Sequence, residues 1–65
     1  MKLIVNGSEH ELLVANLAEL LQRLGYGDAI VATALNHSFV IARSRAATLL
    51  SPGDEVEILA PMQGG

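Results

Sequence analysis

The stretch NLAELLQRLG, residues 16–25, decides the fold expected for this chain of 65 residues. Asn16 is a favourable helix N-cap, and Glu19 three residues later completes an Asn-x-x-Glu version of the capping box. Leucines then recur at the i, i+3, i+4 and i+7 spacing of one apolar helix stripe, at Leu17, Leu20, Leu21 and Leu24. Gly25 follows at the C′ position, where a left-handed residue ends a helix. Because so short a helix is unstable alone in water, we expect it to pack on a sheet.

Two strands are expected before the helix. Lys2 to Val5 is a short apolar run. Asn6-Gly7 follows it and is the strongest two-residue hairpin signal, because both turn positions require positive φ. The returning strand is therefore expected over Ser8 to Val14.

Three more strands are expected after the helix. Ile30 to Leu35 is rich in β-formers, residues 36–38 predict a turn, and Phe39 to Ile41 predicts a strand that pairs back. An irregular connection over residues 43–50 then leads to a Pro-Gly turn and a last strand over Glu55 to Leu59. The pattern predicts an α+β fold in the order β-β-α-β-β, to which the last strand returns after the irregular stretch, with one helix packed on a mixed sheet.

The composition excludes several classes of protein. With 51% hydrophobic and 17% charged residues, the sequence predicts one globular domain over residues 1–65. The absence of cysteine excludes disulfides, a catalytic thiolate and the usual zinc frameworks. A net charge of −3 with only four basic residues argues against nucleic-acid binding. No apolar run approaches the length of a membrane span, so we expect a soluble, cytoplasmic protein with no membrane contact.

The sequence also argues against an enzyme. It has neither a glycine-rich phosphate loop nor the spacing of a nucleophile elbow. Neither His10 nor His37 has a partner at the i+3 or i+4 spacing of a metal pair. We therefore expect no catalytic side chain, no metal site and no bound cofactor.

The end of the sequence suggests a different kind of site. Gly64-Gly65 closes the chain as given, and glycine's lack of a Cβ suits a terminal carboxylate to a narrow slot. Residues 61–65 extended span about 17 Å, enough to reach into another protein's active site. We expect these residues to form a flexible tail.

The chain resembles the ThiS family, the ubiquitin-like sulfur carriers of thiamine (thiazole) biosynthesis, over essentially its whole length. The residues that carry the resemblance are distributed along the chain: Asn6-Gly7, Leu17 to Leu21, Ala34 to Asn36, Val40 to Arg43, Gly53 to Ile58, and Pro61-Met62-Gln63-Gly64-Gly65. Each motif alone is weak evidence for the family, but their order, spacing and terminal position together are specific to it. One departure is Ala42, where these carriers often have proline.

The resemblance implies a β-grasp fold with parallel first and last strands, and a reaction at the C-terminus. An ATP-dependent adenylyltransferase resembling ThiF is implied to adenylate the Gly65 carboxylate. A sulfur donor such as a cysteine desulfurase system then converts it to a thiocarboxylate, and a thiazole synthase resembling ThiG takes the sulfur. Gly64 and residues Pro61, Met62 and Gln63 are implied to enter the partner's active site.

Several readings stay open at this point. Arg43 either anchors the irregular connection or pairs with an acidic side chain, or else it contacts a partner. Asp54, Glu55 and Glu57 form either an acidic rim near the tail or an ordinary solvated face. Exposed aliphatic residues on the open face of the sheet are candidates for a docking patch. The alternatives for function are a related carrier (the small subunit of molybdopterin synthase, or a carrier for tRNA thiolation) or a ubiquitin-like protein modifier.

Overall fold

The computed structural model describes residues 1–60 of the chain, and residues 61–65 lie outside the described part. Within the described part there are five strands, one α-helix and one 3₁₀ helix. In chain order the elements are β1 (Lys2–Val5), β2 (Ser8–Glu11), α1 (Leu17–Arg23), β3 (Ala32–Leu35), β4 (Ser38–Val40), η1 (Ala42–Ala47) and β5 (Glu55–Leu59).

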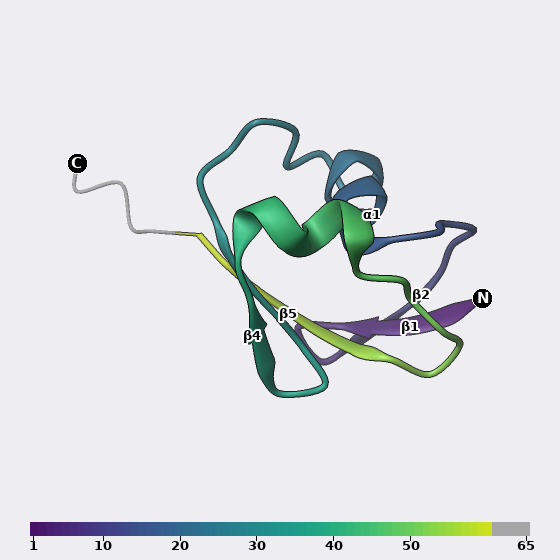
Figure 1. Cartoon of the computed structure of the whole chain (residues 1–65). Helices are drawn as coiled ribbons and strands as arrows, with labels where there is room; N and C mark the ends of the chain where they lie inside the picture. The colour runs from purple at the N-terminus through teal and green to yellow at the C-terminus, as the bar shows by residue number, and fades with distance from the viewer. Residues whose placement is uncertain (61–65) are drawn as a thin grey trace.

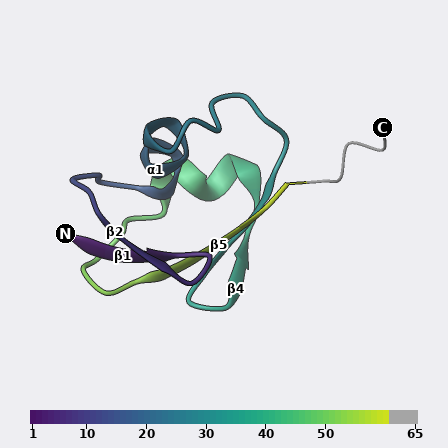
Figure 2. The same ribbon diagram turned by 180° about the vertical axis from the view of Figure 1, so that it is seen from behind.

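The strands form one mixed sheet in the order β2-β1-β5-β3-β4. β1 and β5 are parallel, whereas the β1–β2, β3–β4 and β3–β5 pairs are antiparallel. α1 and η1 lie on one face of the sheet, as the views from front and back both show (Figure 1, Figure 2). This arrangement confirms the expected α+β, β-grasp fold, including its parallel first and last strands.

The ends of the described chain lie at opposite ends of the sheet. Because β1 and β5 run in the same direction, β1 begins at one end of the sheet and β5 finishes at the other (Figure 1). The N-terminus is therefore remote from the point where β5 ends.

Local capping explains why α1 begins and ends where the sequence predicts. The Asn16 side-chain oxygen accepts a hydrogen bond from the Glu19 N–H at 2.8 Å. The Glu19 carboxylate accepts from the Ala15 N–H at 2.6 Å, one residue before the cap. At the other end Gly25 has φ of +88°, and the two hydrogen bonds of a Schellman motif run from Gly25 N–H to Gln22 O and from Tyr26 N–H to Leu21 O.

The core fills the space between the helices and the sheet. Leu17 and Leu20 of α1 are fully buried, in one cluster with Leu3 of β1 and Val56 of β5. The predicted leucine stripe therefore faces the sheet. Val56 and Ile58 share the buried side of β5, as the alternation of that strand predicts.

Three strand boundaries differ from prediction. β2 ends at Glu11 and not at Val14, because β1 has no residues left to pair with beyond Met1, whose carbonyl accepts from the Leu12 N–H. β3 starts at Ala32 and not at Ile30, because its partner β5 ends at Leu59, opposite Ala32.

The third boundary is that of β4. The predicted turn of three residues is a turn of two, Asn36-His37, both at positive φ (48° and 71°). Ser38 therefore pairs with Leu35, and β4 runs from Ser38 to Val40 where the prediction had Phe39 to Ile41. A one-residue difference in turn length moves the whole register of a hairpin.

The cation that anchors the irregular connection is Arg45. Its Nε donates to the Thr33 hydroxyl at 3.0 Å, and its Nη2 donates to the Val31 carbonyl at 2.6 Å. The buried Thr33 hydroxyl donates in turn to the Val40 carbonyl at 2.8 Å. Arg43 is exposed, and among the contacts of residues 1–60 its side chain makes neither a hydrogen bond nor an ion pair. The reading of Arg43 as the anchor is wrong.

We expect Arg45→Gln to lower the free energy of unfolding by about 2 kcal/mol, because it removes charge-assisted hydrogen bonds and leaves the Val31 carbonyl without its partner. The matched variant Arg43→Gln, on the same 3₁₀ helix, should change it by less than about 0.5 kcal/mol. Urea denaturation of both variants measures the difference. Equal stabilities would contradict the anchoring role of Arg45.

Candidate functional site

The residues predicted to carry the chemistry, Pro61, Met62, Gln63, Gly64 and Gly65, lie outside the described residues. The structure does describe the surface around the residues that immediately precede them in the chain. β5 ends at Leu59, and Ala60 is the last described residue. The candidate site is therefore the surface around the end of β5.

An apolar surface covers the open face of the sheet beside the end of β5. We call Ile30, Ala32, Ala34, Phe39 and Leu59 the open-face patch. The strand register brings its members together: Ala32 of β3 lies opposite Leu59 of β5, and Ala34 lies opposite Phe39 of β4. The alanines are small, whereas Phe39 and Leu59 are each 71% exposed. The two alanines therefore form a low apolar surface, which we call the apolar floor, between the larger side chains of Phe39 and Leu59.

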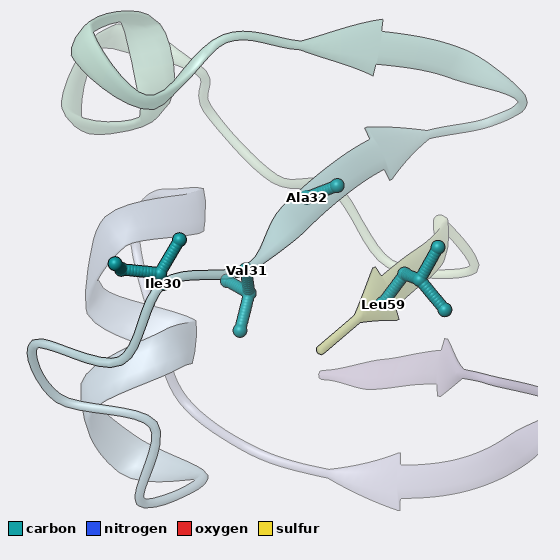
Figure 3. Close-up of a pocket in the computed structure, with 4 residues that line it drawn as sticks. All are labelled: Ile30, Val31, Ala32 and Leu59. Carbon is teal, nitrogen blue, oxygen red and sulfur yellow. The ribbon is translucent and has the colours of Figure 1, made fainter. Parts of the chain in front are cut away.

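Two adjoining hollows give this patch its shape. One has a volume of about 280 Å³ and is lined by Ile30, Val31, Ala32 and Leu59 (Figure 3). The other has about 220 Å³ and is lined by Ala32, Thr33, Ala34, Phe39, Glu57 and Leu59. Since Ala32 and Leu59 line both, the two shallow hollows adjoin each other beside the end of β5. Large contiguous apolar patches are common at protein–protein contacts, so this surface is a candidate docking site.

Acidic side chains border the patch from β5. Glu57 lines one of its hollows, and its carboxylate lies 3.6 Å from the His37 Nδ1 atom. Glu55 lies 3.2 Å from the His37 Nε2 atom. The carboxylate of Asp54, at the start of β5, instead accepts hydrogen bonds from the Ser51 N–H and the Asn36 side chain. The acidic margin beside the patch thus consists of Glu55 and Glu57, without Asp54.

Two asparagines hold β5 from its two sides, and sequence reasoning did not assign them this role. Asn6 and Asn36 each occupy the first position of a hairpin turn, with φ of 49° and 48°. The Asn6 amide pairs with the Ile58 backbone near the end of β5. Asn36 accepts from the Glu55 N–H at the beginning of β5. The turn signal marked both positions, but no local signal tells which strand a side chain will reach.

Residues 1–60 contain neither a metal-binding cluster nor a membrane-spanning helix. In residues 1–60 no group of three or more His, Cys, Asp or Glu side chains is arranged to hold a metal ion. No helix in this part of the chain has the length and apolar character that crossing a membrane requires.

Comparison with known proteins agrees with this geometry. The model of the ThiS family matches residues 3–65, which include Gly64 and Gly65. No curated protein matches the chain significantly.

Two solved structures of a thiamine biosynthesis protein from Geobacter metallireducens are similar to the chain over its whole length. The crystal structure, of the protein described as ThiS, has a TM-score of 0.83 and 36% sequence identity, with 100% of both chains covered. The solution NMR structure has a TM-score of 0.82 and 35% identity, and covers 100% of this chain and 88% of the other. The family match over nearly all residues and the shared fold lead to one conclusion: the chain belongs to the ThiS family.

Proposed function

We propose that this chain is a sulfur carrier of thiamine biosynthesis, which holds sulfur as a thiocarboxylate on Gly65. The observation that carries the proposal is the family match, which extends through Gly64 and Gly65. The likeness to a thiamine biosynthesis protein at 36% identity supports the pathway. The absence of cysteine from the sequence also fits, because without a thiol the backbone carboxylate is the available carrier of sulfur.

The proposed chemistry starts from a poor electrophile. A C-terminal carboxyl group has a pKa of about 3.5 and is ionised at neutral pH. One carboxylate oxygen attacks the α-phosphorus of ATP, and pyrophosphate leaves. A sulfide-level sulfur then attacks the acyl carbon of the adenylate, and AMP leaves with one former carboxylate oxygen. When the sulfur comes from a persulfide, a thiol reduces the S–S bond to release it. The product is a terminal –COS⁻ group.

In this scheme the chain is the substrate of other enzymes and not itself an enzyme. The proposed partners are a ThiF-like adenylyltransferase, a sulfur donor of the cysteine desulfurase type, and a ThiG-like thiazole synthase. ATP is consumed by the adenylyltransferase, and the carrier holds no cofactor. The proposed compartment is the cytoplasm.

The open-face patch is the proposed docking surface for the adenylyltransferase. It adjoins the end of β5, and residues 61–65 span at most about 17 Å. An enzyme that receives Gly65 must therefore bind close to this end of the sheet. The apolar floor fits aliphatic side chains, and Glu55 and Glu57 fit basic groups at the margin of the partner. The net charge of −3 favours encounter with a basic surface.

Intact-mass measurement tests the proposal. The protein is incubated with ATP, its adenylyltransferase and a sulfur donor, and a carrier gains the mass difference between sulfur and oxygen at Gly65. A protein modifier would appear attached to lysine side chains of other proteins. Transfer of the loaded sulfur to a thiazole synthase, and not to molybdopterin or tRNA enzymes, tests the pathway.

Gly64→Val should lower the rate of adenylation on the order of 10- to 100-fold. A β-branched residue restricts the backbone and widens the segment that must enter the partner, and small misplacements of a reacting group cost rates of this size. The rate of ATP–pyrophosphate exchange that depends on the carrier measures the effect. Gly64→Ala is the matched control and should be affected less. Unchanged adenylation of Gly64→Val would remove the steric argument.

A further inference from the structure

The parallel ladder between β1 and β5 ends earlier than β5 does. Asn6 follows β1, and its N–H donates to the Val56 carbonyl at 2.9 Å. At this point the chain turns away from β5 into the Asn6-Gly7 hairpin. β5 continues to Leu59, so its last residues have no strand of β1 beside them.

One side chain takes the place of the missing strand. The Ile58 N–H donates to the Asn6 Oδ1 atom at 2.8 Å, and the Asn6 Nδ2 atom donates to the Ile58 carbonyl at 3.1 Å. The side-chain amide thus satisfies both backbone groups of Ile58, which a continuation of β1 would otherwise have paired. Ile58 is only 6% exposed, so both of its backbone groups depend on this partner.

The position of this contact connects it to the tail. Ile58 lies two residues before Ala60, the last described residue. On the other side, Leu59 pairs with Ala32, the first residue of β3. We propose that Asn6 is a positioning residue, which holds the end of β5 and so sets the direction from which residues 61–65 approach a partner. This inference rests on the proposed function, because it assigns Asn6 a role in the presentation of Gly65.

The chain contains a matched control for this role. Asn36 has the same place in its hairpin turn and nearly the same φ as Asn6. Its Oδ1 atom accepts from the Glu55 N–H at 2.9 Å, and its Nδ2 atom donates to the Asp54 carboxylate at 3.1 Å. It therefore makes two comparable hydrogen bonds at the opposite end of β5. Glycine tolerates positive φ at either position, so Asn→Gly removes the amide and keeps the turn.

The first measurement is amide hydrogen exchange by NMR on the wild type, Asn6→Gly and Asn36→Gly. We expect exchange at Ile58 to be at least about tenfold faster in Asn6→Gly, because its N–H loses its acceptor. In Asn36→Gly exchange at Ile58 should change by less than about threefold. Equal protection of Ile58 in the wild type and Asn6→Gly would overturn the inference.

The second measurement is steady-state adenylation of the same three proteins by the adenylyltransferase. We expect Asn6→Gly to raise the KM for the carrier about tenfold with little change in kcat. Without the Asn6 amide, the end of β5 must lose conformational entropy when the carrier binds the enzyme, and this loss weakens binding. Asn36→Gly should keep a wild-type KM. Equal KM values for the two variants would overturn the positioning role. If the wild type itself is not adenylated, the proposed function fails, and the exchange data alone still decide whether Asn6 holds β5.

Discussion

Deletion of Gly65 is expected to abolish sulfur loading while the fold stays intact. The deletion moves the reacting carboxylate back by one residue, about 3.4 Å along an extended chain. A misplacement of about 1 Å already costs on the order of 100-fold in rate. Intact mass after incubation with ATP, adenylyltransferase and sulfur donor should show no thiocarboxylate. Urea denaturation should give the stability of the wild type, since the deletion changes no member of the core cluster between Leu3 and Ile58.

An extension after Gly65 should have the same effect, because it removes the free carboxylate from that residue. The matched control is an extension before Met1, which lies at the opposite end of the sheet from the end of β5 (Figure 1) and should load normally. Normal loading of either C-terminal variant would contradict the assignment of Gly65. So would protein isolated from cells whose mass shows residues beyond this position.

Leu59→Glu is expected to weaken binding to the adenylyltransferase by at least about 100-fold. Leu59 lines both hollows of the open-face patch, and a carboxylate there would be buried without a partner in an apolar interface. The new charge would also stand near Glu57 on the same strand. Isothermal titration calorimetry with the purified enzyme measures the loss of affinity.

Leu49→Glu is the matched control for this prediction. Leu49 is 72% exposed, against 71% for Leu59, but it lies in the connection after η1 and not on the patch. Because both side chains are exposed, both variants should keep a stability within about 0.5 kcal/mol of the wild type. Binding to the enzyme should change by less than about threefold in Leu49→Glu. Equal losses in the two variants would show that the patch is not the docking surface.

Much of the fold follows from signals between near neighbours in the sequence. The start and end of α1 were predictable because Asn16 and Gly25 act on backbone groups within a few residues. The Asn6-Gly7 hairpin was predictable for the same reason, since positive φ is a property of the turn residues themselves. The boundaries of β2 and β3 were not, because they depend on where a partner strand ends.

The residues of the candidate site also divide into those predicted from the sequence and those that only the structure identified. Gly64 and Gly65 were predicted from the end of the sequence and from the family resemblance, and their role stays a prediction, because both lie outside the described residues. That Arg45 and not Arg43 is the anchor required the structure, because it depends on which side chain reaches Thr33 of β3 and the neighbouring Val31 carbonyl. The members of the open-face patch were also unknown before the register of β3, β4 and β5 was known.

The sequence by itself determined the helix, its caps, the Asn6-Gly7 turn and the family. Each of the first three depends on residues that lie close together, and the family depends on the order of its motifs. Only the tertiary structure decided that Asn6 holds Ile58, 52 residues further along the chain, and that Phe39 and Leu59 border one apolar depression. The physical reason is that turn and cap energies depend on local backbone conformation. Contacts across the sheet depend on register, which is fixed by the packing of the whole core.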